Sequence, residues 1–240
     1  MQNSRRCCSP NFLGSIRRAG LLGVWLGLAC WGGCCAAEDP AWPEVFREDF
    51  ENGAERWQPG DPQAWRIVLE GGSKRFDQFQ QSKVTFPVRA PFNRAVAREL
   101  TVGSFQFDVD FRSTARDYPH RSLCLFFGVQ DDTHLYYVHF GQRADDHANQ
   151  IFIVNDAPRV KISKTSADGT PWDEQWHHAR IIRNVETGEI KVFFDDLEKP
   201  IMTAIDKTFL WGQIGIGSFD DTGMFDNVVV RGVRVSRPEK

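Results

Sequence analysis

The chain has 240 residues, of which 41% are hydrophobic, 12% aromatic and 25% charged, and its formal net charge is −3. This length and balance exclude a disordered chain, a collagen-like chain and a protein that crosses a membrane many times. The lysines and arginines form no basic block, so we expect no nucleic-acid partner. The chain has 19 phenylalanines and 8 tryptophans but only 3 tyrosines, and this abundance of phenylalanine favours β-strands.

Residues 1–37 are typical of a secretory signal peptide. Arginines precede an apolar run at 21–31, and small residues follow it at 35–37. The apolar run is shorter than the roughly 20 residues that a membrane-spanning helix needs. The sequence therefore predicts cleavage after Ala37 and a single domain over 38–240, with no transmembrane segment in the mature chain. We expect a bacterial protein that is exported to the periplasm, the extracellular space or the cell surface.

Two other forms of the export signal remain open. Arg17 and Arg18 are compatible with a twin-arginine signal. Alternatively, Cys30 or Cys34 is a lipid-modified first residue of the mature protein. The remaining cysteine beyond the signal region, Cys124, lies in an apolar run and is expected to be a buried small side chain rather than a catalytic thiol.

After residue 38 the sequence has the period of β-strands. Phenylalanine and valine alternate with polar residues over 105–112, which is the pattern of a strand with one buried face. Turn signals such as Asn52-Gly53 and Asp168-Gly169 separate such segments, and no long amphipathic helix is found. The other predicted strands are 65–69, 123–130, 135–140, 150–155, 176–183, 190–195, 214–219 and 227–235. Regular short strands predict an all-β sandwich or jelly roll.

Several segments resemble a known fold family. They are FREDFENG at 46–53, WHHARI at 176–181, WGQIGIG at 211–217 and FDNVVV at 225–230. Their order is similar to that of the concanavalin A-like lectin/glucanase jelly roll, which includes laminin-G-like domains. Within this group the chain most resembles the secreted bacterial 3-keto-disaccharide hydrolase (3-keto-glucoside lyase/hydratase) domain family. The resemblance covers nearly all of the mature chain and implies two curved antiparallel sheets with a sugar on the concave face.

Common catalytic motifs are absent from the sequence. It has no Glu-x-Asp-x-x-Glu motif of the laminarinase type, no Gly-x-Ser-x-Gly motif, no phosphate loop and no His-Glu-x-x-His motif. Asp108 and Asp110 are two residues apart on one strand, so their Cα atoms are expected roughly 7 Å apart, within reach of glycosidase spacing. We expect these carboxylates to lie on a solvated strand face rather than to act in catalysis.

Polar and aromatic residues gather in the middle of the chain. Five of the six histidines and all three tyrosines lie between Tyr118 and His177. Aromatic rings and planar polar side chains are what a saccharide site needs, although the same residues also serve in turns and ion pairs. The first hypothesis is therefore a carbohydrate-binding domain for a saccharide or polysaccharide. Its candidate ligand-binding residues are Arg116, Asp117, His120, Arg121, Tyr137, Asn155 and Arg159.

The second hypothesis is a 3-keto-glycoside hydrolase or lyase. A ketone next to C2–H acidifies that proton, so a histidine or carboxylate base removes it and a second group protonates the leaving oxygen. The candidate acid–base residues are His139, His177, Asp145 and Asp146.

The resemblance also implies a structural calcium ion. In many sugar-binding jelly rolls of this type, one calcium ion ties the first strand to the last. The matching positions are Asp49 and Glu51 near the start and Asp226 near the end. Carboxylates and nearby carbonyl groups are the ligands that calcium prefers.

Overall fold

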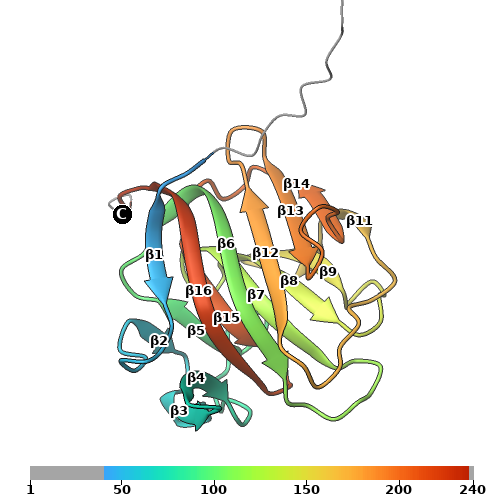
Figure 1. Cartoon of the computed structure of the whole chain (residues 1–240). Helices are drawn as coiled ribbons and strands as arrows, with labels where there is room; N and C mark the ends of the chain where they lie inside the picture. Colours follow the sequence, from blue (N-terminus) through green and yellow to red (C-terminus); the bar gives the residue numbers. More distant parts are fainter. Residues whose placement is uncertain (1–40, 238–240) are drawn as a thin grey trace, which may run out of the picture. The chain divides into compact units, whose positions relative to one another are not determined.

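The computed structural model describes residues 41–237, which form two antiparallel β-sheets packed face to face (Figure 1). The predicted signal peptide lies outside the described residues. The larger sheet has nine strands in the order β11-β14-β13-β12-β6-β16-β4-β3, and β1 also pairs with β16. These strands are β1 (Glu44–Glu48), β3 (Trp65–Glu70), β4 (Ser73–Gln78), β6 (Val102–Ser113), β11 (Ser163–Ser166), β12 (His177–Arg183), β13 (Glu189–Phe194), β14 (Met202–Ile205) and β16 (Gly223–Arg234).

The smaller sheet has seven strands in the order β10-β9-β8-β7-β15-β5-β2. Its strands are β2 (Trp57–Pro59), β5 (Asn93–Ala97), β7 (Ser122–Val129), β8 (His134–Gly141), β9 (Gln150–Asn155), β10 (Val160–Lys161) and β15 (Gln213–Ser218). A short 3₁₀ helix, η1 (Pro62–Ala64), precedes β3. No helix in the stretch from residue 41 to residue 237 is both long and apolar enough to cross a membrane.

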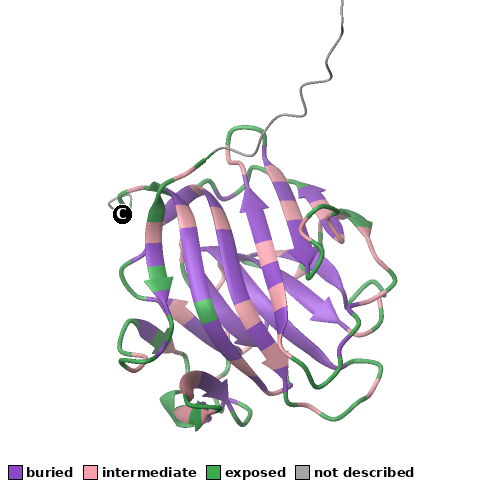
Figure 2. Cartoon of the chain, viewed as in Figure 1, coloured by how far each residue is buried: buried purple, intermediate pink, exposed green. Residues whose placement is uncertain are grey.

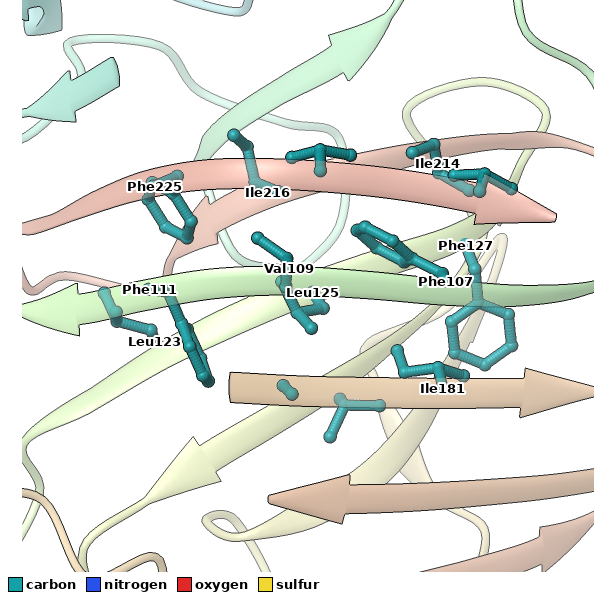
Figure 3. Packing of buried hydrophobic residues seen from close by; sticks show 14 of the residues in the cluster. Phe107, Val109, Phe111, Leu123, Leu125, Phe127, Ile181, Ile214, Ile216 and Phe225 are labelled. Atoms are coloured by element: carbon teal, nitrogen blue, oxygen red, sulfur yellow. The ribbon is translucent and has the colours of Figure 1, made fainter. Parts of the chain in front are cut away.

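The main core lies between the two sheets, and β6 shows how the sequence builds it. The residues at 105, 107, 109 and 111 are apolar and buried, as the period-2 pattern predicts. Figure 3 shows Phe107, Val109 and Phe111 beside Leu123 and Leu125 of β7. Each of these phenylalanines stabilises the fold by roughly 1.5–3 kcal/mol through burial.

The ends of the described chain are joined by direct strand pairing. β1 pairs antiparallel with β16, with Phe46 opposite Val230. β16 also pairs with β6, so the last strand lies between the first strand and the centre of the larger sheet (Figure 1). The first and last strands are therefore held together by backbone hydrogen bonds.

A second apolar cluster lies on the outer face of the smaller sheet, which is the face directed away from the larger sheet. Its members alternate along β7, β8 and β9 with residues of the main core. They are Ala90, Cys124, Phe126, Val129, Leu135, Tyr137, Phe152 and Val154. Cys124 is a buried free thiol, as predicted, and burial raises its pKa. Apolar residues on both faces make β7 and β8 buried along almost their whole length (Figure 2).

The loop 79–92 between β4 and β5 covers part of this outer face. Ala90 belongs to the second apolar cluster, and Val88 packs against it. Asn93, at the start of β5, fixes the loop because its side chain accepts a hydrogen bond from the Ser82 N–H at 2.6 Å and donates one to Ser218 Oγ at 2.9 Å. The loop therefore forms a fixed wall on the outer face of the smaller sheet.

Candidate functional site

A cavity of about 570 Å³ opens on the outer face of the smaller sheet. This volume lies in the range of roughly 300–1,000 Å³ that is common for ligand sites. The lining residues come from well-separated segments, including the loop 79–92 and the connections that follow β8, β9 and β15. Of the residues singled out in the sequence, the cavity brings together His120, His139, Asp145 and Arg159. We call this cavity the outer-face pocket.

Six further residues line the outer-face pocket; two are the small apolar residues Ala148 and Pro158, and four are charged or aromatic residues that were not predicted. These four are Arg89, His147, Phe219 and Asp220. Arg89 lies in the loop 79–92, where no regular pattern marks a functional position. Phe219 follows β15, and a large aromatic residue at a strand end beside two aspartates is the only signal that the sequence offered for this segment.

His139 is the buried polar group of the pocket, with 5% of its surface exposed. Burial is the main cause that lowers the pKa of His139 to about 3, and repulsion from Arg159 adds to it. The ring is therefore neutral near pH 7. Its Nδ1 accepts a hydrogen bond from the Asn149 N–H at 3.3 Å, which places the ring proton on Nε2. His139 thus offers the pocket a hydrogen-bond donor and has no free lone pair for a general base.

The backbone next to His139 is built to hold this ring. Asn149 adopts a positive φ of 52°, which asparagine tolerates better than most residues. Its side chain donates to the Ala167 carbonyl at 2.9 Å and accepts from the Thr170 hydroxyl at 2.9 Å. At Gly141 an added Cβ would lie 3.1 Å from His139 Nδ1, so a glycine leaves room for the ring.

Arg159 connects the pocket to the second apolar cluster. Its guanidinium donates to the Tyr137 hydroxyl at 3.2 Å and lies 5.1 Å from the ring centre of Phe152. Tyr137 stacks on Phe152 with ring centres 5.0 Å apart. Burial raises the pKa of Tyr137, so its phenol keeps its proton and remains a donor. The guanidinium is thereby held in place by two side chains of the smaller sheet.

His177 does not belong to the outer-face pocket. It begins β12 in the larger sheet, and its ring stacks on Phe194 with ring centres 4.7 Å apart. Its Nδ1 lies 2.8 Å from Asp195 Oδ2, and its Nε2 lies 3.1 Å from Asp173 Oδ1. The structure therefore separates His139 and His177, which the sequence analysis had placed in one group of candidates.

The other predicted site residues also lie outside the pocket lining. Arg121 is buried and donates to the backbone carbonyls of Ser113 and Asp173, which is a structural role. Asp146 is exposed and pairs with Lys161 at 2.5 Å. Four remain: Arg116, which lies over the Tyr118 ring; Asp117, which accepts a hydrogen bond from Gln142; Asn155, which is exposed at the end of β9; and Tyr137, which is buried in the second apolar cluster.

The three carboxylates proposed for calcium have other partners. Asp49 Oδ1 accepts a hydrogen bond from the Glu51 N–H at 3.2 Å. Asp226 pairs with Arg75 through Oδ2, and its Oδ1 is buried without a partner. Glu51 accepts from the Ser73 hydroxyl at 2.5 Å and from the Lys74 N–H at 2.9 Å. Within residues 41–237 no group of three or more His, Cys, Asp or Glu side chains is arranged to hold a metal ion. Because the Arg75 guanidinium stands at Asp226, this donor set fits a divalent cation poorly.

Asp108 and Asp110 lie on the outer face of the larger sheet, but Asp108 is not solvated as expected. It is only 4% exposed, and its carboxylate accepts from Arg180 at 2.7 Å and contacts His178 Nε2 at 3.1 Å. Asp110 contacts His178 Nδ1 at 2.7 Å and accepts from Asn227 at 2.8 Å. Both carboxylates are hydrogen-bonded to side chains of neighbouring strands, because β12 and β16 place basic and amide groups next to them.

No protein-family model matches this chain, and no curated protein matches it. Among solved structures, the carbohydrate-binding module CBM66 from Bacillus subtilis is similar with a TM-score of 0.52 at 16% identity, over 74% of this chain and 96% of that one. Domain 4 of AbnA, a GH43 extracellular arabinanase from Geobacillus stearothermophilus, in complex with arabinotriose, gives 0.52 at 8% identity, over 81% and 95%. These likenesses confirm the predicted jelly-roll sandwich of the concanavalin A-like type.

Proposed function

We propose that this chain is an exported carbohydrate-binding domain that holds a saccharide in the outer-face pocket. The observation that carries the proposal is the convergence of polar groups from distant segments on one cavity of a jelly roll. Of the similar solved structures, one is a carbohydrate-binding module, CBM66, and another is an arabinanase domain in complex with arabinotriose. We take the outer face of the smaller sheet as the counterpart of the concave sugar-binding face.

The groups of the pocket suit the hydroxyls of a sugar. Arg159 supplies guanidinium donors and His139 supplies one imidazole donor, while the Asp145 carboxylate is an acceptor. Phe219 is the aromatic residue of the lining, but the guanidiniums of Arg89 and Arg159 lie over its ring. We therefore assign recognition to paired hydrogen bonds rather than to stacking of a sugar on an aromatic ring.

A glycan array followed by titration calorimetry tests the proposal. We expect at least one saccharide class to bind the chain 38–240, and Asp145→Asn to weaken that binding about tenfold, since a charged hydrogen bond is lost. The matched control is Asp168→Asn, because Asp168 is an exposed aspartate that does not line the pocket. Absence of binding across the array, or equal loss in both variants, would overturn the proposal.

A second candidate function is a 3-keto-glycoside hydrolase or lyase of the family that the sequence resembles. One observation favours it: the pocket holds a carboxylate, Asp145, together with the imidazole of His120. In this scheme Asp145 takes the C2 proton, the C1–O bond breaks, and His120 protonates the departing oxygen. His139 is a poor base for this step because Asn149 occupies its Nδ1 lone pair.

The catalytic alternative has its own test. The chain 38–240 is incubated with 3-keto-trehalose or a 3-keto-glucoside, and released glucose is measured. Turnover that is lost in Asp145→Asn and kept in Asp168→Asn would establish the enzyme. Saccharide binding without any release of glucose leaves the carbohydrate-binding domain as the function.

A further inference from the structure

Two arginines from distant segments meet at one aromatic ring in the outer-face pocket. The guanidinium carbon of Arg159 lies 4.5 Å from the Phe219 ring centre, and that of Arg89 lies 5.5 Å from it. The backbone N–H of Arg159 also donates to the backbone carbonyl of Arg89 at 3.2 Å, which joins the loop 79–92 to the connection between β9 and β10. The fold therefore places both guanidiniums at one aromatic ring in the lining of the same cavity.

Neither guanidinium forms a salt bridge within the described range 41–237, and the one side-chain hydrogen bond of Arg159 goes to the Tyr137 hydroxyl. The two carboxylates of the lining, Asp145 and Asp220, lie beyond salt-bridge distance of both arginines. Arginines on the outer face of the larger sheet differ, because Arg112 pairs with Glu70 and Arg180 pairs with Asp108. Arg89 and Arg159 therefore keep guanidinium donors for an anionic ligand, which a positive charge attracts.

The buried polar side chain of the lining is also a donor, because His139 is held with its proton on Nε2 while Asn149 occupies Nδ1. Tyr137 is buried outside the lining, and its hydroxyl accepts from Arg159 and so helps to hold that guanidinium. These donors and positive charges of the lining favour a ligand rich in hydrogen-bond acceptors. A planar guanidinium binds a carboxylate or sulfate through two parallel hydrogen bonds.

We propose that the outer-face pocket recognises an acidic saccharide, and that the carboxylate or sulfate group of the sugar lies against Arg89 and Arg159. This inference rests on the proposed carbohydrate-binding function and names its ligand class. The carboxylates of Asp145 and Asp220 then accept hydrogen bonds from the neutral hydroxyls of the same sugar, while the two arginines bind its acidic group.

The test compares charged and uncharged forms of the same oligosaccharide by titration calorimetry. One arm uses oligogalacturonides against their methyl esters, and the other uses sulfated carrageenan oligosaccharides against desulfated ones. We expect the charged form to bind at least about tenfold more tightly in one arm, which corresponds to one charge-assisted hydrogen-bonded pair. The affinity for the charged form is expected to fall as sodium chloride rises, because salt screens the attraction.

Three variants assign that preference to residues. Arg89→Gln, at an exposed loop position, and Arg159→Gln are each expected to remove most of the preference for the charged form. Arg159→Lys keeps the positive charge but loses the paired donors of the guanidinium, so we expect it to retain part of that preference. Arg143→Gln is the control, since Arg143 is an exposed arginine that does not line the pocket. Thermal melting of each variant shows that it is folded.

The outcomes separate the two proposals. Equal binding of charged and neutral forms overturns the acidic-saccharide assignment and leaves the carbohydrate-binding function standing. A preference that survives in both Arg89→Gln and Arg159→Gln overturns the assignment to these residues. If no form of either oligosaccharide binds, while the array finds a neutral ligand, the anionic class is wrong; if nothing on the array binds either, the proposed function fails as well.

Discussion

The outer face of the larger sheet and the outer-face pocket of the smaller sheet differ in how their arginines are paired. On the larger sheet, cross-strand neighbours neutralise one another, as Arg75 does with Asp226 and Arg180 with Asp108. On the smaller sheet, the middle of the face is covered by apolar residues and by the loop 79–92. Arg94 pairs there with Asp132, but Arg89 and Arg159 at the outer-face pocket lack a salt-bridge partner within the described chain.

The burial pattern shows the same contrast. In Figure 2, β6, β12 and β16 alternate between buried and partly exposed residues, whereas β7 and β8 are buried almost throughout. A face whose charges are paired among themselves stabilises the fold and offers little to a ligand. A cavity with unpaired arginines keeps hydrogen-bond donors for a ligand, and this difference supports the proposal that the saccharide lies on the smaller sheet.

The largest expected effect comes from breaking the paired face. Asp108→Ala removes the acceptor of Arg180 and His178 and leaves both cations without it in a largely buried setting. We expect a loss of about 3 kcal/mol in the free energy of unfolding, at the lower end for a buried ion pair because the partners are partly exposed. Urea denaturation measures it. Asp145→Ala, on the other face, removes only the exposed acceptor of the His147 N–H and is expected to lower stability by about 1 kcal/mol or less, and equal losses would erase the contrast.

The free energy of unfolding at acidic pH tests the environment of His139 in the outer-face pocket. The groups that face it are Arg159, His120 and Asp145. Its pKa is lowered to about 3 in the folded state by burial and by Arg159, while the unfolded value is about 6.5. Below pH 6.5 the unfolded chain binds a proton at this histidine and the folded chain does not. The contribution of neutral His139 to the free energy of unfolding is therefore present above pH 6.5 and is lost as pH falls towards 3.

Between pH 6.5 and pH 5 the loss due to His139 is expected to be about 2 kcal/mol. The measurement is the pH dependence of unfolding in the protein and in His139→Gln, because subtracting the two isolates this group from the titrating carboxylates. Parallel curves for the two proteins would show that His139 titrates normally in the fold.

His178 on the paired face has the opposite pH dependence. Hydrogen bonds to Asp108 and then to Asp110 raise its pKa to about 9. The folded state holds a proton that the unfolded state releases above pH 6.5, so the contribution is fully present below pH 6.5 and is lost as pH rises through 9. Since His178 is about one-third exposed, we expect only about 1 kcal/mol after solvent screening. Unfolding at pH 6.5 and 9.5 in His178→Asn and in the parent protein tests it; a loss that persists in the variant would assign the effect to another group.

The sequence predicted the central strands well because their apolar period is strong. The segment 150–155 matches β9, and 105–112 lies inside β6. The short strands β4 and β5 were not predicted, because Lys74, Arg75 and Arg94 interrupt the apolar pattern in them. β4 forms a local hairpin with the predicted strand β3, but its pairing with β16, like that of β5 with β15, joins segments far apart in the chain and no local pattern reveals it.

The candidate site was predicted only in part, for a related reason. His120, His139, Asp145 and Arg159 stood out as polar residues among aromatics, and the fold does bring these four together. Arg89, the second arginine of the pocket, could not be predicted from local sequence. Arg89 reaches the pocket because the loop 79–92 crosses the sheet and meets Arg159 through a backbone hydrogen bond, a contact set by tertiary packing.

The smallest expected effect concerns calcium, at the end of the paired face. The Arg75 guanidinium already neutralises Asp226, and Glu51 is held by Ser73 and Lys74, so a calcium ion there would have to displace these partners and lie beside a positive charge. We expect the melting temperature of the chain 38–240 to change by less than about 1 °C between EDTA and millimolar calcium, because a ligand that does not bind the folded state does not stabilise it. In Arg75→Gln the carboxylate of Asp226 loses its counter-ion, and calcium is then expected to raise the melting temperature relative to EDTA. A calcium-dependent rise already present in the parent protein would show that the ion outcompetes Arg75, and would place a metal rather than an ion pair at this end of the larger sheet.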